Sequence, residues 1–116
     1  MVWSCLVSIL PGMAQTEKLT DYVNPFVGTD GYGNVYPGAQ IPFGGIQISP
    51  DTDSRFYDAA SGYKYNHLTL MGFSLTHLSG TGIPDLGDFL FIPGTGEMKL
   101  EPGTHEDPDQ GYRSRY

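Results

Sequence analysis

The sequence predicts an all-β fold, an antiparallel β-sandwich, and three observations point to that class. Gly and Pro number 16 and 9 of 116 residues, so few windows are long enough for a helix without an interior breaker. Eight Tyr and six Phe add residues that strands favour. About seven short apolar or alternating segments follow one another between turn signals, and that spacing is typical of a sandwich.

The charge balance limits the classes of partner. The chain carries a net charge of −7 and only 6 Lys and Arg residues, which are scattered along the sequence. Nucleic acid phosphates and anionic lipids are bound by clustered Lys and Arg, so neither is an expected partner. Charged residues make up 16% and hydrophobic residues 39% of the chain, which excludes a disordered tail and a membrane bundle.

Residues 1–14 predict a secretion signal. Residues 2–10 form an apolar run that is too short to span a bilayer, which needs ~20 residues, and small Gly12 and Ala14 follow where a signal peptidase cleaves. No Lys or Arg precedes the run, so a buried N-terminal strand is the alternative. A signal implies a secreted or periplasmic protein and removes Cys5, the single cysteine; a lipidated Cys5 at the cell surface is another alternative.

Residues 15–61 indicate strands separated by glycine turns. Residues 21–27 predict a strand that enters a turn. Residues 28–34 form a glycine-interleaved loop without the Lys of a phosphate loop or the spacing of a dinucleotide fingerprint. Residues 45–49 alternate in polarity and predict a strand ended by Pro50.

Two aspartates follow that strand. Asp51 and Asp53 resemble the start of a calcium-binding loop, but Arg55 stands where an acidic or amide ligand is due and the required Gly is absent. We therefore expect an Asx-type turn at this place.

The second half predicts further strands. Residues 62–65 and 68–73 are strand candidates, and Gly72 predicts a bulge because the apolar phase shifts there. Residues 89–92 are continuously apolar, as in a strand buried on both faces. Residues 112–116 begin an alternating strand with no turn after it, which suggests a fragment.

The stretch from residue 72 to residue 88 concentrates polar chemistry around a tight loop. Ser74, His77 and Asp85 invite comparison with a hydrolytic triad, but a nucleophile elbow needs Gly at position 76, which is Thr. His77 fits either a buried, hydrogen-bonded histidine or a ligand contact, and the sequence leaves both open. Asp85 and Asp88 are the candidate pair of carboxylates for glycoside hydrolysis, with loop and strand capping as the alternative.

The histidines and the aromatic residues bear on metal binding and sugar binding. His67, His77 and His105 are too dispersed for a zinc spacing. The surplus of aromatic residues beside loop amides suits sugar binding, because apolar sugar faces stack on rings while hydroxyls need polar side chains. These residues are Tyr32, Tyr36, Phe56, Tyr57, Tyr63 and Tyr65.

Several ordered motifs resemble the N-terminal domain of glycoside hydrolase family 92. They are residues 23–29, 33–39, 42–44, 48–52, 61–65, 72–82 and 85–88, in the family's order. The resemblance covers about residues 22–116. Two departures concern residues 56–60, where the family often has an aromatic cluster with Trp, and Leu75, which replaces a frequent His.

The resemblance implies an exo-acting, calcium-dependent α-mannosidase that inverts configuration and acts on mannose-containing glycans. Such an enzyme combines an N-terminal β-sandwich with a C-terminal (α/α)6 helical domain. Residues 15–116 would be an incomplete sandwich, the N-terminal part of the larger sandwich domain. The resemblance places the catalytic carboxylates and most calcium ligands in the helical domain, so we expect no catalytic residue and no metal ligand in this chain, which would be inactive by itself.

The resemblance also implies that two loops face the shared cleft and line the substrate. The implied substrate-binding residues are Gly28, Thr29, Asp30, Gly31, Tyr32, Asn34, His77, Ser79, Gly80 and Thr81. A stand-alone carbohydrate-binding sandwich is the alternative function, and a purely structural module is a third.

Overall fold

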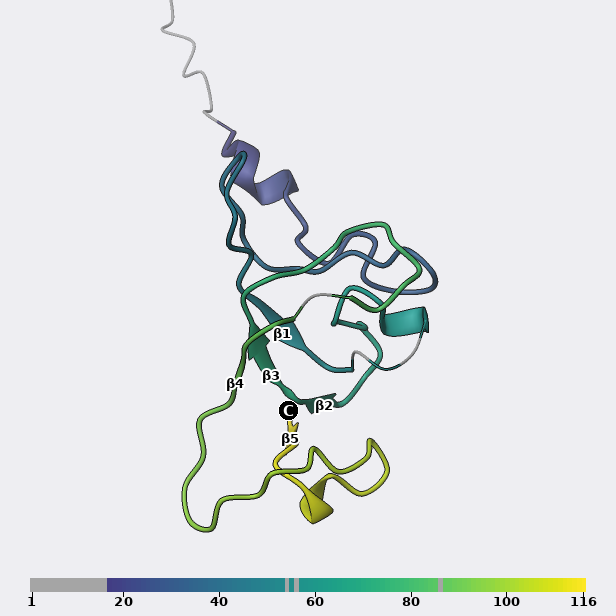
Figure 1. Cartoon of the computed structure of the whole chain (residues 1–116). Coiled ribbons are helices and arrows are strands. Elements are labelled where there is room, and N and C mark those ends of the chain that lie inside the picture. Colours follow the sequence, from purple (N-terminus) through teal and green to yellow (C-terminus); the bar gives the residue numbers. More distant parts are fainter. Residues whose placement is uncertain (1–16, 54, 56, 86) are drawn as a thin grey trace, which may run out of the picture.

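The computed structural model describes residues 17–53, 55, 57–85 and 87–116. Five short strands form two antiparallel sheets in this part of the chain (Figure 1). β1 (Ser49–Asp51), β3 (Gly72–Ser74) and β4 (Leu90–Phe91) form one sheet in the order β1-β3-β4. β2 (Thr69–Leu70) and β5 (Ser114–Arg115) form the other. The predicted all-β, antiparallel class is confirmed, while the predicted signal segment with Cys5 lies outside the described residues.

The helical elements of the described residues are three 3-10 helices: η1 (Leu19–Tyr22), η2 (Tyr57–Ala59) and η3 (Pro108–Gln110). No helix in this part of the chain is long and apolar enough to cross a membrane. The strand predicted over residues 21–27 is wrong. η1 occupies its start, and the Asn24 side chain then closes a turn by accepting a hydrogen bond from the Phe26 N–H at 2.9 Å.

The strand predicted over residues 45–49 is displaced towards the C-terminus. β1 contains Pro50, which was expected to end the strand and instead lies opposite Phe73 of β3. β1 has a neighbour on one side only, and an edge strand tolerates proline because the missing N–H can face away from the ladder. The Gln47 N–H donates to the Leu75 carbonyl at 2.8 Å, so the predicted segment still contributes a hydrogen bond to the segment that follows β3.

The prediction of one strand over residues 68–73 is wrong because the chain changes sheets within it. β2 ends at Leu70 and β3 begins at Gly72. Gly72 has a φ of +155°, and a Cβ built there lies 2.7 Å from the Phe91 carbonyl oxygen. Glycine therefore allows β4 to approach β3 as closely as it does.

β4 is an edge strand and not the doubly buried strand that residues 89–92 predicted. Phe89 is 67% exposed and Phe91 58% exposed, since β4 pairs with β3 alone. β5 confirms the strand predicted over residues 112–116 in a shorter form. Residues 62–65 form no strand, because a hydrogen bond from the Gly62 N–H to the Ala59 carbonyl (2.8 Å) closes a turn there.

The interior of the described residues is largely polar. The buried hydrophobic residues are Ala59, Ala60, Tyr63 and Met71. Buried polar or charged side chains include Thr29, Asp51, Thr52, Asp53, Lys64, Thr69, Ser74, His77 and Arg113. Buried polar groups cost free energy unless they are hydrogen-bonded, so specific polar contacts hold this interior together.

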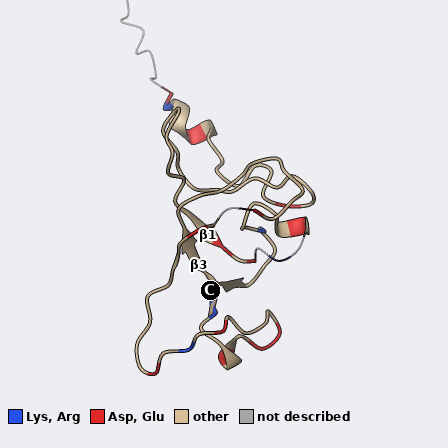
Figure 2. Ribbon diagram, viewed as in Figure 1, with Lys and Arg blue, Asp and Glu red and all other residues tan. Residues whose placement is uncertain are grey.

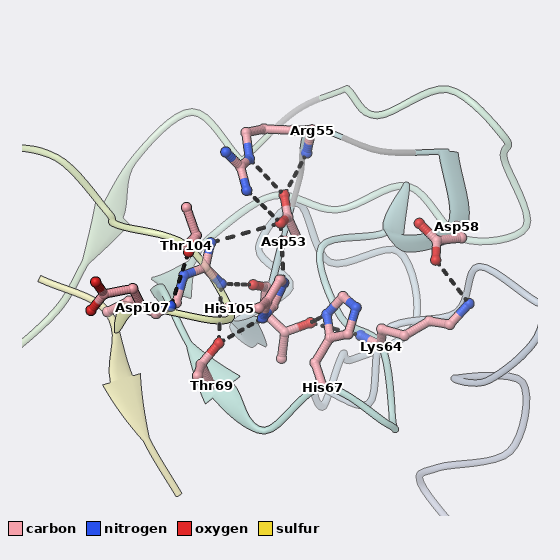
Figure 3. A network of polar contacts seen from close by, with 11 residues as sticks. Asp53, Arg55, Asp58, Lys64, His67, Thr69, Thr104, His105 and Asp107 are labelled. Carbon is pink, nitrogen blue, oxygen red and sulfur yellow. Dashed lines mark hydrogen bonds and ion pairs between the residues drawn. The ribbon is translucent and has the colours of Figure 1, made fainter. Parts of the chain in front are cut away.

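Asp53 is the centre of one such network (Figure 3). Its carboxylate accepts hydrogen bonds from the Arg55 N–H at 2.9 Å and from the Arg55 guanidinium at 3.2 and 3.0 Å. The first of these bonds confirms the predicted Asx-type turn. His105 Nε2 lies 3.2 Å and Arg113 Nη2 lies 3.7 Å from Oδ2. The network thus ties the C-terminal segment to the chain that follows β1.

The network sets the charge states of its members. Burial alone would raise the pKa of Asp53, but the hydrogen bonds from Arg55 and the charges of Arg55 and Arg113 outweigh burial and lower that pKa to about 2. The His67 ring lies 4.1 Å from the His105 ring. Burial, followed by the nearby His105, lowers the pKa of His67.

Candidate functional site

Two loops predicted to bind substrate lie side by side in the fold. The first loop comprises residues 28–34 and the second loop residues 77–82. The Gly80 N–H donates a hydrogen bond to the Asn34 carbonyl at 2.7 Å and joins them directly. This contact places two segments that are far apart in the sequence side by side.

Tyr57 of η2 lies between the two loops. Its ring centroid is 5.9 Å from that of Tyr32 in the first loop, at an interplanar angle of 53°. A Cβ built on Gly82 in the second loop lies 2.3 Å from Cε2 of Tyr57, so that ring packs directly on the glycine. Tyr32 is 77% and Tyr57 59% exposed, and the pair forms an aromatic surface that is open to solvent.

Local hydrogen bonds give the first loop its shape. The Val35 N–H donates to the Gly28 carbonyl at 3.2 Å, and the Gly33 N–H donates to the Asp30 carbonyl at 3.2 Å. Gly28 has a φ of +82°, and a Cβ there would lie 2.8 Å from Cγ2 of Val35. The glycine is therefore required where the loop closes on itself.

The predicted site residues divide by exposure. Asp30, Gly31, Tyr32, Ser79 and Gly80 are exposed, and Gly28 and Thr81 are partly exposed. Thr29, Asn34 and His77 are buried at 2%, 7% and 6% exposure. The exposed members can contact a ligand directly, whereas the buried members lie beneath the surface. Their role towards substrate remains a prediction.

Both ring nitrogens of His77 contact other residues of the chain. Nδ1 lies 2.7 Å from the Gln47 carbonyl, and Nε2 lies 3.0 Å from Oδ1 of Asp51 and 2.9 Å from Oγ of Ser74. The Tyr36 ring lies 5.0 Å from the imidazole. Since a carbonyl oxygen only accepts, Nδ1 carries a proton and donates it to Gln47.

The arrangement around His77 differs from that of a hydrolytic triad. In a triad the acid contacts one ring nitrogen and the nucleophile the other. Here Asp51 and Ser74 share Nε2, and the acid is Asp51 in place of the candidate Asp85. These contacts join β1 and β3 to the start of the second loop. His77 therefore has a structural role in this arrangement and not the role of a triad base.

Some buried oxygens lack a hydrogen-bond partner within the described residues. They are Oδ1 of Asn34, Oδ2 of Asp51 and Oγ of Ser61. Buried polar atoms are rarely left unpaired. Asn34 belongs to the first loop, so its amide oxygen is an acceptor placed within the candidate site.

A pocket of about 320 Å³ lies beside the first loop. Its lining consists of Asn24, Phe26, Asp30 and Tyr65. The Phe26 and Tyr65 rings meet edge to face with centroids 5.5 Å apart. The aromatic surplus in the sequence predicted Tyr65, but Asn24 and Phe26 were missed because their contribution depends on the turn that replaces the predicted strand.

Asp88, one of the two candidate catalytic carboxylates, is hydrogen-bonded within the protein. Asp88 Oδ2 accepts a hydrogen bond from the Thr76 hydroxyl at 2.9 Å, and Thr76 Oγ1 accepts from the Gly87 and Asp88 N–H groups. Asp88 therefore caps the chain that follows the second loop, in agreement with the capping role that was the alternative to catalysis. Within the described residues, no group of three or more His, Cys, Asp or Glu side chains could hold a metal ion.

The basic residues do not gather at the candidate site (Figure 2). Of the six Lys and Arg residues, Lys64 and Arg113 are buried and paired with carboxylates. The surface around the two loops thus offers aromatic rings, backbone amides and short polar side chains. That combination suits a neutral, hydroxyl-rich ligand.

Comparison with known proteins identifies the family of this chain. The chain belongs to glycosyl hydrolase family 92, because residues 22–116 match the model of the family's N-terminal domain. One similar protein is an uncharacterized secreted glycosidase of Arthroderma benhamiae, 36% identical over 73 residues. The matched region covers 62% of this chain and 9% of that protein, so the chain spans a small fraction of its relative.

Proposed function

We propose that this chain is the substrate-facing N-terminal part of a secreted α-mannosidase that removes terminal mannose from glycans. The observation that carries the proposal is the meeting of the first and second loops around Tyr32 and Tyr57, in a chain that belongs to a glycosidase family. The relative described as a secreted glycosidase and the apolar segment at residues 2–10 support export.

The two loops would hold the sugar by two kinds of contact. The apolar face of a hexose packs on aromatic rings, and Tyr32 and Tyr57 are exposed enough to provide such a face. Sugar hydroxyls require donors and acceptors, which Asp30, Ser79 and Thr81 can supply at the rim.

The chemical step would belong to residues outside this chain. Inverting hydrolysis needs an acid and a base on opposite sides of the scissile bond, with carboxyl groups ~6.5–9.5 Å apart. Asp88, one of the two candidates, accepts a hydrogen bond from the Thr76 hydroxyl. Calcium, which we propose the complete enzyme requires, would likewise be held elsewhere, since the described residues contain no suitable cluster of His, Cys, Asp or Glu. A C-terminal (α/α)6 helical domain is the proposed source of both.

Steady-state hydrolysis of α-mannobiose by the full-length enzyme tests the proposal. Tyr57→Ala should raise KM by roughly tenfold, the loss expected for about 1.4 kcal/mol of stacking. Tyr22→Ala on η1 is the matched control, because Tyr22 is also exposed (69%) but lies outside both loops. An enzyme that hydrolyses no α-mannoside, or a Tyr57 variant with the KM of the control, would contradict the proposal.

A stand-alone carbohydrate-binding module is the second candidate. It is favoured by the fact that the aromatic surface and the pocket beside the first loop form within the described residues. Binding of mannose oligosaccharides by the 116-residue chain itself, at affinities similar to those of the full-length protein, would select this function.

A further inference from the structure

Lys64 is a buried lysine that reaches across the fold to the first loop. Its side chain is 8% exposed, and Nζ donates a hydrogen bond to the Gly31 carbonyl at 2.7 Å, from 33 positions further along the chain. Lysine is rarely buried unless its ammonium group is paired. This contact is therefore a specific feature of the fold.

The same ammonium group also faces η2. Asp58 Oδ2 lies 3.5 Å from Nζ (Figure 3), and the Tyr32 ring centroid lies 5.8 Å away. Asp58 is next to Tyr57 on η2. Lys64 thus connects the element that presents Tyr57 to the loop that presents Tyr32.

Hydrogen bonds hold the backbone of Lys64 in place. Its backbone N–H donates to the hydroxyl of fully buried Thr52 at 2.9 Å. The adjacent Tyr65 N–H donates to the Thr29 carbonyl at 3.0 Å, which is a second link to the first loop. The side chain therefore extends from a rigid point to the loop.

The tip of the first loop has little packing of its own. Gly31 is exposed with a φ of +59°, and a Cβ built there would meet nothing within 4 Å. Tyr32 is 77% exposed. Besides the turn bonds within the loop and the contact between the Tyr32 and Tyr57 rings, the hydrogen bond from the Lys64 ammonium group to the Gly31 carbonyl holds the tip.

We propose that Lys64 is a positioning residue for sugar binding. It holds the Gly31 carbonyl and thereby fixes Tyr32 opposite Tyr57, so that both rings are in place before a mannoside arrives. Buried at 8% exposure, the lysine does not itself touch substrate. The inference rests on the proposed function and adds a preorganising residue to it.

Lys64→Met tests this role because methionine keeps an apolar stem of similar length and removes only the donor and the charge. Lys18→Met is the matched control, since Lys18 is exposed, precedes η1 and loses the same charge. Asp58→Asn is an intermediate variant that weakens the ion pair and leaves the bond to Gly31. All three are made in the full-length enzyme.

Two readouts separate positioning from general stability. In Lys64→Met, KM for α-mannobiose should rise about tenfold with kcat changed less than about twofold, because Lys64 acts on the bound position of the sugar and not on the reacting groups. Amide hydrogen exchange of Gly31 and Gly33 should accelerate about tenfold, while exchange of the β3 amides stays within about twofold. Asp58→Asn should show a smaller change in both, and Lys18→Met none.

Unchanged exchange in the first loop of Lys64→Met overturns the inference, and so does an exchange increase that extends to β3, which would make Lys64 a general structural residue. The exchange measurement does not depend on activity. If the unmodified enzyme hydrolyses no α-mannoside, the proposed function fails, whereas selective loop exchange still establishes that Lys64 positions the loop.

Discussion

His77 Nε2 lies 3.0 Å from Oδ1 of Asp51, 26 residues earlier in the chain, and both side chains are buried. Nδ1 of the same ring donates to the Gln47 carbonyl. One histidine therefore joins β1 and the segment before it to the entry of the second loop. A Cβ built on Gly62 would lie 2.1 Å from the Asp51 oxygen, so the surrounding chain is closed tightly over this pair.

His77→Ala should destabilise the fold by about 3 kcal/mol, because it leaves a buried carboxylate without its partner. Thermal or chemical unfolding of the full-length enzyme measures this loss. The activity lost should follow the unfolded fraction. A lowered kcat/KM with an unchanged melting temperature would instead show that His77 contacts the substrate.

A double-mutant cycle isolates the pair. Asp51→Asn should cost less in the His77→Ala background than in the unmodified protein, since the interaction is then already absent. Additive losses would contradict a direct contact between the two side chains.

Acid should destabilise the protein in two stages. The pKa of His67 is lowered below its usual value near 6.5, so the unfolded chain takes up this proton more readily than the folded chain. The stability that depends on the neutral ring is present above about pH 6.5 and is lost as the pH falls below it. His67→Gln should remove this first stage from a plot of melting temperature against pH.

The second stage belongs to Asp53. The pKa of Asp53 is lowered to about 2 in the folded state. The contribution of Asp53 to the free energy of unfolding is therefore present above the unfolded pKa of ~4 and is lost as the pH falls towards 2. Asp53→Asn should abolish this stage and cost about 3 kcal/mol at neutral pH, because buried Arg113 loses its carboxylate. A melting temperature that stays constant between about pH 5 and 2 would contradict the assignment.

Gly82→Ala should move the Tyr57 ring, because the new Cβ would lie 2.3 Å from it. The ring is 59% exposed and can turn away at a cost of less than about 1 kcal/mol, so binding suffers more than stability. We expect KM for α-mannobiose to rise at least about fivefold. Gly45→Ala is the matched control, since a Cβ there meets nothing within 4 Å. Equal KM values in the two variants would show that Tyr57 does not contact the sugar.

The 116-residue chain by itself should release no mannose from α-mannobiose, with or without calcium. We propose that the acid and the base of inverting hydrolysis lie outside this chain, and Asp88, one of the two candidates within it, is hydrogen-bonded to Thr76. Incubation of purified chain with substrate and detection of free mannose checks this expectation. Hydrolysis that disappears in Asp85→Asn or Asp88→Asn would move catalysis into this domain.

The same chain should also be poorly stable in isolation. Phe89, Phe91, Met98 and Leu100 are between 58% and 83% exposed, while the buried hydrophobic residues of the described chain are few, and two of them are alanines. Exposed apolar surface along an edge strand favours association. Denaturation followed by light scattering should show aggregation. A reversible, cooperative transition of a soluble monomer would contradict this prediction and would favour the stand-alone binding module.

The class of fold and the family could be read from the chain alone, because both depend on local chemistry. Glycine and proline spacing excluded long helices, and ordered motifs such as residues 33–39 and 72–82 carried the resemblance that the family match then confirmed. The Asx-type turn at Asp53 was also predictable, since it needs only a hydrogen bond to the amide two residues later.

Strand positions and site partners required the folded chain, because they depend on contacts between distant residues. Pro50 lies within a strand only because β1 is an edge, and β4 can approach β3 closely only because residue 72 is glycine. The sequence placed His77 beside a tight loop but could not name Asp51 as its partner. Lys64 carried no local signal of its role, since its contact with Gly31 spans 33 positions and exists only when the hydrogen-bonded interior brings the two segments together.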